Sequence, residues 1–339
     1  MIAKSLLLIY CLLTASPSAR DGSITGTVVN TSSGKMPASR AEVVLRVRVH
    51  GEELICDQTI TDDQGRFVFH KLPLGEEYNY MPAANHDGVH YPGPRLKLSP
   101  EQPQAKVELS VCDSVSAPSP LVIRRQEIFI RSAPGALMVT ESISIDNPSN
   151  RCYLGLSLQD GGDPITLQLS IPSNFQRVTF QKEFFGRRFL LFNGKLVTSI
   201  PWPPGRREVK FTYTLPIEHG FYRWQRPLDL PCEHIRVSVQ AVNHEDIDCN
   251  LPALPSESTG EVLFESSGET LPVGQVIQVE MGRLPMPPMT YARWLALAVL
   301  LVLLLGGAIL SLKRSQSVSA QQKQDESATR PRLRKSKAA

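Results

Sequence analysis

The chain has 339 residues, which is room for about two domains of ordinary size. Hydrophobic residues make up 42% of it, a normal share for a folded protein, and the formal net charge is only +3. Because the small basic excess is concentrated near the C-terminus, the composition gives no support for a nucleic-acid-binding protein.

Residues 1–19 have the features of a secretory signal peptide. Lys4 precedes the apolar stretch SLLLIYCLL, which is too short to span a membrane, and the small-residue stretch TASPSA follows. We therefore expect this segment to be removed and the chain after it to lie outside the cytosol.

Residues 20–113 alternate between apolar and polar side chains. In the stretch AEVVLRVRV, for example, Val43 and Leu45 face one side of a predicted strand, and Glu42 and Arg46 face the other. Short alternating segments separated by turn residues are typical of antiparallel sheets with one wet face. The sequence predicts a β-sandwich here.

The stretch TDDQGRFVFHKLPLGEEY raises the first functional question, because Asp62 and Asp63 could belong to a calcium loop. Such a loop needs oxygen ligands at alternate positions and a closing bidentate Glu. Gln64 interrupts the series, and no Glu stands at the required distance. The favoured interpretation is a turn in which an Asp side chain accepts backbone hydrogen bonds and Gly65 adopts positive φ.

Residues 114–120 form a polar break that contains proline, and we predict that they link two domains. Segments such as VKFTYTL and IRVSVQA alternate again within residues 121–284, with turn signals such as NPSN between them. The fold class predicted is therefore all-β, with two β-sandwich domains.

A membrane anchor is predicted near the C-terminal end. A Pro-rich stalk at 285–293 leads into the uncharged apolar run at 294–312, which as a helix would span about 28 Å. The tail at 313–339 is basic, which favours a cytoplasmic location for it. We expect a single-pass type I protein of the cell membrane, with its bulk extracytoplasmic (periplasmic). The tail could also bind anionic lipids, although a solvated tail is favoured.

Five cysteines follow the signal peptide, in a compartment that permits disulfides. None forms a C-x-x-C pair, so their spacing does not indicate a zinc site. We expect one bond within each domain and one spare thiol, although the connectivity is not fixed by sequence. The expected pairs are Cys56–Cys112 and Cys232–Cys249, and the spare thiol is Cys152.

Metal and catalytic sites have weak support. His86 and His90 are four residues apart, but the surrounding NHDGVHYPGP is not helical, and in an extended strand the two rings would lie about 13 Å apart. A shared ion would need a sharp loop and a third ligand such as Asp87. No G-x-S-x-G, H-E-x-x-H or Gly-rich phosphate motif occurs. We expect no cofactor and no enzymatic activity.

Aromatic residues and arginines are interleaved in HGFYRWQRPLDLP and IPWPPGRR. Tyr222, Trp224 and Arg226 share one face of a predicted strand, and Trp202 is a further candidate. Such residues are enriched at binding hot spots, so they form the candidate binding site. The alternative is ordinary packing, because one face of a strand in a sandwich belongs to the core.

The first predicted domain resembles the carboxypeptidase regulatory-like domain, a transthyretin-like sandwich of seven strands. The matching residues lie on the first two predicted strands and in the hairpin after them: Gly26, Val28, Val29, Ala41, Val43, Leu45, Thr61, Asp62, Gly65, Phe67, Phe69, Leu72, Pro73 and Gly75. The chain departs from the family pattern at Glu76 and Glu77, which separate Gly75 from Tyr78. The resemblance implies a bacterial host and a domain without catalytic residues of its own, which serves folding, stabilisation or binding.

The leading functional hypothesis is a membrane-anchored extracytoplasmic binding or scaffold protein. It would hold a protein partner or cell-envelope carbohydrate near the membrane. One alternative is an accessory subunit of a membrane complex for envelope biogenesis or redox maturation. The other is a metal-binding or hydrolytic ectodomain.

Overall fold

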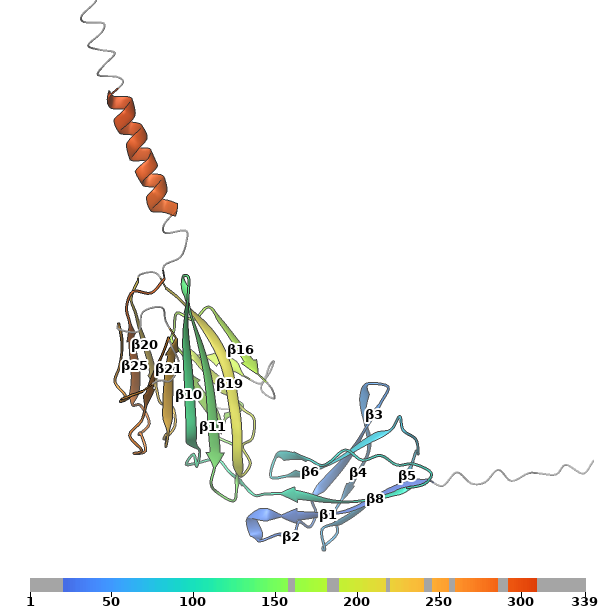
Figure 1. Cartoon of the computed structure of the whole chain (residues 1–339). Coiled ribbons are helices and arrows are strands. Elements are labelled where there is room, and N and C mark those ends of the chain that lie inside the picture. Colours follow the sequence, from blue (N-terminus) through green and yellow to red (C-terminus); the bar gives the residue numbers. More distant parts are fainter. Residues whose placement is uncertain are drawn as a thin grey trace, which may run out of the picture.

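The computed structural model describes residues 21–157, 162–181, 189–217, 220–240, 246–255, 260–285 and 292–309. These residues are mostly β-strands, with one long helix near the C-terminal end (Figure 1). The all-β fold class with a single apolar helix is therefore confirmed. The signal peptide predicted at 1–19 and the basic tail predicted at 313–339 lie outside the described residues.

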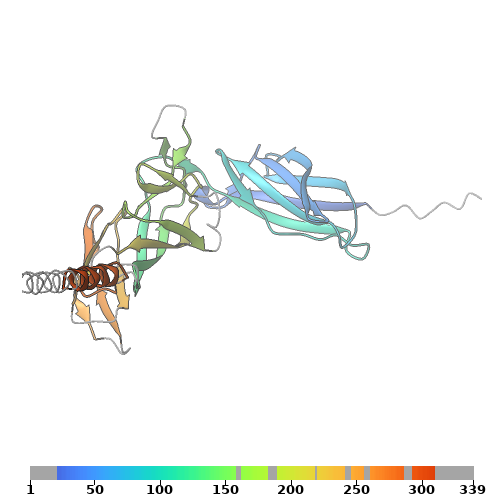
Figure 2. The same ribbon diagram turned by 90° about the horizontal axis from the view of Figure 1, so that it is seen from above.

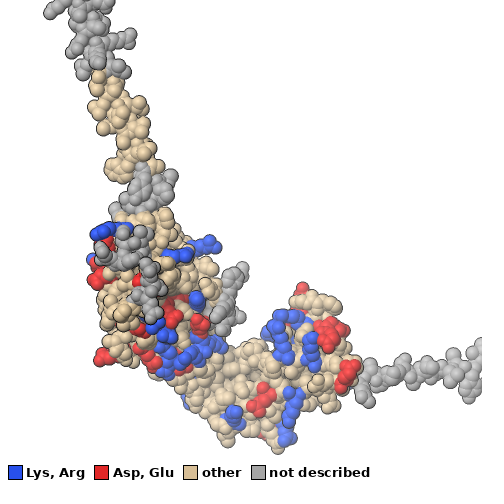
Figure 3. Space-filling model, viewed as in Figure 1, with Lys and Arg blue, Asp and Glu red and all other residues tan. Residues whose placement is uncertain are grey.

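The helix Ala292–Ile309 has 18 residues and is long and apolar enough to cross a membrane. It extends away from the β-strands, and none of its most apolar window is buried (Figures 1 and 2). Its surface is largely free of charged side chains, whereas acidic and basic residues are mixed over the strands (Figure 3). The helix is consistent with a single-pass membrane protein, although three of the residues predicted to span, 310–312, are not described.

Residues 22–111 form what we call the N-terminal β unit. Its strands are β1 (Gly22–Asn30), β2 (Met36–Pro37), β3 (Glu42–Val49), β4 (Glu52–Ile60), β5 (Arg66–Leu72), β6 (Asn79–His86), β7 (Val89–Pro92) and β8 (Gln104–Val111). One sheet has the order β2-β1-β5, with β8 parallel to β1, and the other has the order β4-β3-β6-β7. Both sheets contribute side chains to one core, among them Ile24, Leu45, Phe69, Tyr80 and Leu109.

The predicted alternation is visible in this unit. Val43, Leu45 and Val47 of β3 are buried, while Glu42 is exposed. The turn before β5 also forms as expected. Asp62 Oδ1 accepts hydrogen bonds from the backbone N–H groups of residues 64 and 66, at 2.9 and 2.8 Å, and Gly65 has φ +71°. The acidic pair is thus part of a turn.

Residues 122–281 form the C-terminal β unit. Its large sheet has the order β16-β19-β11-β10-β21-β24-β23. The strands of that sheet are β10 (Val122–Ala133), β11 (Ala136–Asn147), β16 (Arg177–Gln181), β19 (Gly205–Pro216), β21 (Ile235–Gln240), β23 (Ala253–Leu254) and β24 (Glu261–Glu265). The sheet is antiparallel except where β10 and β21 run parallel.

Two smaller sheets complete the described part of this unit. They have the orders β15-β18-β17 and β20-β25-β22. Their strands are β15 (Leu167–Ser170), β17 (Leu190–Phe192), β18 (Lys195–Thr198), β20 (Tyr222–Pro227), β22 (Ile247–Cys249) and β25 (Val276–Met281). A two-stranded antiparallel ribbon of β13 (Leu156–Ser157) and β14 (Pro164–Ile165) comes directly before β15 in the chain.

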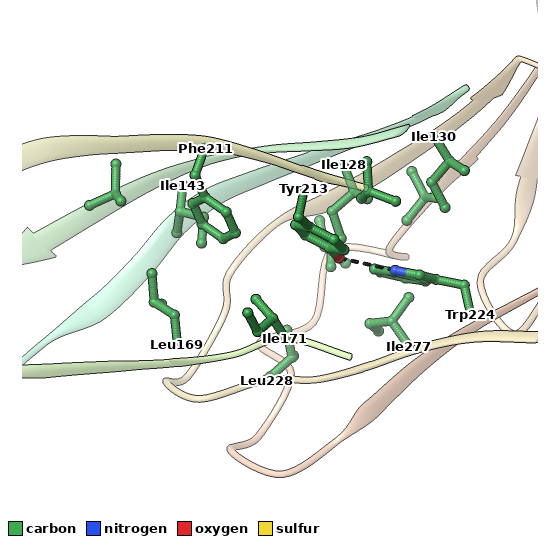
Figure 4. Close-up of a cluster of buried hydrophobic side chains, with 14 of the residues drawn as sticks. Ile128, Ile130, Ile143, Leu169, Ile171, Phe211, Tyr213, Trp224, Leu228 and Ile277 are labelled. Atoms are coloured by element: carbon green, nitrogen blue, oxygen red, sulfur yellow. Dashed lines mark hydrogen bonds between the residues drawn. The ribbon is translucent and has the colours of Figure 1, made fainter. Parts of the chain in front are cut away.

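The core of the C-terminal β unit lies between the large sheet and the two smaller ones. Figure 4 shows Ile128, Ile143 and Phe211 of the large sheet facing Leu169 and Trp224 of the smaller sheets. The period-two pattern of the sequence produces this arrangement, because alternate residues of each strand point to the same side.

The predicted linker at 114–120 is partly a strand. Ser114–Val115 form β9, which pairs in parallel with β12 (Cys152–Tyr153). The two β units are therefore connected by a backbone ladder as well as by the chain itself.

Candidate functional site

The aromatic–arginine face predicted as a binding site lies in the core. Trp224, Arg226 and Trp202 are buried, and only Tyr222 is partly accessible. The opposite face of β20 is exposed, and there Arg223 forms an ion pair with Glu280 at 2.9 Å. The expected contact surface is corrected accordingly. Sheet packing buries this face of β20, so Trp224, Arg226 and Trp202 cannot meet a partner from solution.

Burial of Arg226 creates an ion network inside the C-terminal β unit. Its Nε lies 3.2 Å from Glu141 Oε2, and its Nη1 lies 2.5 Å from Asp229 Oδ2. Tyr213 donates its hydroxyl hydrogen to Glu141 Oε1 at 2.9 Å, and Trp224 Nε1 donates to the Tyr213 oxygen at 3.0 Å (Figure 4). The network links β11, β19 and β20 across the core.

One guanidinium faces two carboxylates in this network. Burial lowers the pKa of Arg226, but the carboxylates of Glu141 and Asp229 outweigh it, so the net pKa is raised and the guanidinium stays charged. Burial, followed by the negative charge of Glu141, raises the pKa of Tyr213, which remains a neutral donor. The network therefore holds the strands together through an ion pair at each carboxylate.

A second polar assembly joins the two β units, and we call it the junction. Ser32 Oγ donates to the carbonyl of Asn150 at 2.6 Å, and Asn150 Nδ2 donates to the carbonyl of Ser32 at 3.0 Å. The N–H of Asp113 donates to Ser32 Oγ at 2.9 Å. The β9–β12 ladder continues from there, with Cys152 N–H donating to the Asp113 carbonyl at 2.8 Å.

Three potential metal ligands meet at the junction. His86, Asp87 and Asp113 offer atoms that all lie within 4.8 Å of one another. His86 Nε2 lies 3.1 Å from Asp113 Oδ1, which also accepts a hydrogen bond from Asn30 Nδ2 at 2.6 Å. The hydrogen bond from His86, and then that from Asn30, holds the pKa of Asp113 below its ordinary value. Imidazole and carboxylate groups suit ions such as Zn²⁺ or Mn²⁺.

This cluster differs from the one considered in the sequence. Asp87 and Gly88, with φ of 47° and 76°, make the sharp turn between β6 and β7. The turn places His86 and Asp87 beside Asp113, but His90 pairs with Asn85 across the hairpin, its Nδ1 2.8 Å from Asn85 Oδ1. His90 takes no part in the cluster.

All five cysteines of the described residues are free thiols, so neither expected disulfide is present. Cys56 is exposed on edge strand β4, whereas Cys112 is buried after β8 in the other sheet. Cys232 is buried with its Sγ 3.4 Å from the carbonyl of His234, and Cys249 lies in β22. Cys56 and Cys112 thus lie in different sheets, while Cys232 and Cys249 belong to the same core and are both free.

Cys152, expected to be spare, instead lies against Cys112. The two buried residues share a small apolar cluster with Val89. The hydrogen bond from the Cys152 thiol, together with one from Tyr91, outweighs burial and lowers the pKa of Cys112 to about 7. The same thiol contact and burial raise the pKa of Cys152.

An open surface lies along one side of the N-terminal β unit. β4 is an edge strand, and nearly all of its residues are exposed, including Leu54 (62%), Ile55 (66%) and Ile60 (66%). A groove of about 640 Å³ continues from Ile60 over residues of β1, β5 and β8, such as Val68 and Lys106. Exposed apolar side chains on an unpaired edge are suited to contact with another chain.

Sequence reasoning missed Glu141 and Asp113. Glu141 had a visible signal, because it occupies an inward position of β11 between the buried residues Val139 and Ile143. A carboxylate in such a position needs a buried partner. Asp113 had no comparable signal, since its neighbours come from segments far apart in the chain.

The comparisons with protein-family models and with curated proteins give no match for this sequence. The resemblance of the first β unit to the carboxypeptidase regulatory-like domain therefore stays a prediction.

Proposed function

We propose that the protein is a membrane-anchored, extracytoplasmic binding protein that holds a partner protein near the membrane. The observation that carries this proposal is the uncovered apolar helix Ala292–Ile309, which follows two strand-rich units with an accessible edge at β4. Signal-like residues before the first unit and basic residues after the helix support an outward orientation of both units.

The proposal includes two separate β-sandwich domains, the first of the carboxypeptidase regulatory-like type. Two distinct hydrophobic clusters, one for each β unit, support the division. The turn formed by Asp62 and Gly65 supports the family assignment, because it falls in the stretch that carries the resemblance.

The partner is proposed to bind along β4 by adding an extended strand. A strand at a sheet edge has unpaired backbone N–H and C=O groups, which supply affinity, while side-chain contacts supply specificity. Leu54, Ile55 and Ile60 would provide the apolar contacts. Glu52 and Asp57 on the same strand favour a partner segment that carries Lys or Arg among apolar residues, while Glu53 is already paired with Arg46 and Arg48.

Photocrosslinking of the full chain in its native membrane tests this docking site. A photoreactive residue in place of Ile55 is expected to capture one partner protein, while the same residue in place of the exposed Val273 captures none of it. Adding Leu54→Lys should reduce the crosslink at position 55 by about tenfold or more, because the leucine side chain would become buried against the partner on binding and that apolar contact is lost.

Equal crosslinking from positions 55 and 273 would contradict the proposal, as would retention of the full chain on cell-envelope carbohydrate with no crosslink at position 55. The identity of a captured partner decides whether the protein is a free-standing scaffold or an accessory subunit of a membrane complex.

A metal-binding ectodomain is the second candidate, favoured by the grouping of His86, Asp87 and Asp113. Titration of the detergent-solubilised full chain with Zn²⁺ tests it. Binding of one ion should be lost in His86→Ala and kept in His90→Ala, since His90 lies outside the cluster. Loss in both variants, or no binding by the wild type, would exclude this site.

A further inference from the structure

The junction encloses two thiols that belong to different β units. Cys112 directly follows β8 of the N-terminal unit, and Cys152 begins β12 beside the C-terminal unit. Both are buried, with exposed fractions of 3% and 0%. The parallel ladder aligns Cys152 with Ser114, two residues after Cys112, so the backbone itself brings the cysteines together.

The two side chains pack in one buried apolar cluster with Val89. They are close enough that each thiol shifts the pKa of the other. The hydroxyl of Tyr91 lies 3.2 Å from Cys112 Sγ and donates to the carbonyl of Cys112 at 2.8 Å. The tyrosine comes from β7 and packs against the cluster that holds both thiols.

Neighbouring hydrogen bonds fix the surrounding backbone. Ser32 and Asn150 bond reciprocally across the junction, and Leu154 N–H donates to the Val115 carbonyl at 2.9 Å. None of the other described cysteines shares the apolar cluster of Cys112 and Cys152. The two cysteines are therefore each other's only cysteine neighbours in this cluster of the described residues.

We propose that Cys112 and Cys152 form a disulfide that fastens the two β units together. The thiols lose two protons and two electrons as the S–S bond forms. An oxidant of the disulfide class accepts both electrons and both protons and leaves as two thiols. Because both sulfurs are buried in the closed junction, we expect the exchange to occur before the junction closes or while it is open.

The disulfide would keep the two β units from separating at the junction. With free thiols, the units are held by hydrogen bonds and by one short backbone ladder, which can open together. With the bond formed, Cys112 and Cys152 stay connected when those hydrogen bonds break. The binding edge at β4 then keeps a limited range of positions relative to the membrane helix.

Peptide mapping of the full chain tests the proposal without any substitution. The protein is solubilised in detergent, treated with oxidised glutathione, alkylated and digested without reductant. We expect one linked peptide pair containing Cys112 and Cys152, lighter by two hydrogen atoms than the separate peptides, which disappears after reduction. Recovery of both cysteines as alkylated thiols after oxidation would overturn the proposal, as would linkage of Cys112 to Cys56.

Thermal unfolding gives a second, independent measurement. Reduction should lower the Tm of the wild type by about 10 °C and leave the Tm of Cys112→Ser/Cys152→Ser unchanged. Cys56→Ser is the matched control, and it should keep the full reductant effect because Cys56 is exposed on β4. A reductant effect of equal size in the double variant, or none in the wild type, would contradict the bond. Neither peptide mapping nor thermal unfolding depends on partner binding at β4, so the disulfide can be tested separately from the proposed function.

Discussion

At the scale of single residues, the stability of the C-terminal β unit depends on a buried guanidinium. Arg226→Met removes the guanidinium that lies 3.2 Å from Glu141 Oε2, while the Glu141 side chain stays inside the core. Breaking one half of a buried pair costs about 3–5 kcal/mol of unfolding free energy. Urea denaturation followed by tryptophan fluorescence measures it.

Arg223→Met is the control for this prediction, since Arg223 makes an exposed ion pair with Glu280 from the same strand. It should cost about 1 kcal/mol or less. Equal losses in the two variants would mean that the buried network contributes no more than a surface pair.

Gly155 allows a comparison of backbone strain and steric overlap. It has φ +77°, and a Cβ there would lie 1.9 Å from the carbonyl oxygen of Ile165. Gly194 has φ +73° with open space around the same position. Gly194→Ala should cost about 1–2 kcal/mol from the left-handed conformation alone, and Gly155→Ala clearly more. Chemical denaturation of both variants checks the order, and equal costs would contradict it.

At the scale of elements, β20 shows how packing selects one face of a strand. Trp224→Ala removes a fully buried ring and its hydrogen bond to Tyr213, so we expect a loss of about 3–5 kcal/mol in unfolding free energy. Gln225→Ala, on the exposed face of the same strand, should be nearly neutral. A neutral Trp224→Ala would show that β20 is not held in the core.

The sequence predicts strands better than it predicts sites. Alternation identifies the inward residues of β19, because period two is a local property of an extended chain, whereas in β3 Val44 is buried as well as its neighbours Val43 and Leu45. It also shows that one face of β20 is buried, but not which face, since that depends on the distant partner Glu141. The contact of Cys112 with Cys152 depends on the β9–β12 ladder, and nothing local in either segment indicates that pairing.

At the scale of the whole molecule, the helix Ala292–Ile309 is long and apolar enough to anchor both β units at a membrane. Leu301→Arg places a charge near the middle of the helix, which costs about 2.5–3.5 kcal/mol of insertion free energy. We expect a larger fraction of the variant than of the wild type in the soluble fraction after alkaline carbonate extraction. Leu301→Ile is the matched control and should remain in the membrane pellet. An unchanged distribution of Leu301→Arg would argue against a spanning role.

The parallel pairing of β1 with β8 has a consequence for synthesis. The chain is made from its N-terminus, so Gly26 emerges long before its partner Val107, and Ile128 long before Val237. Until those partners arrive, the first strand of each unit has an open side, and non-local pairing of this kind is slow. A nascent chain that stops before β8 cannot complete the first unit. The first unit can therefore complete its sheet only after β8 has been synthesised, and β1 keeps an open side until then.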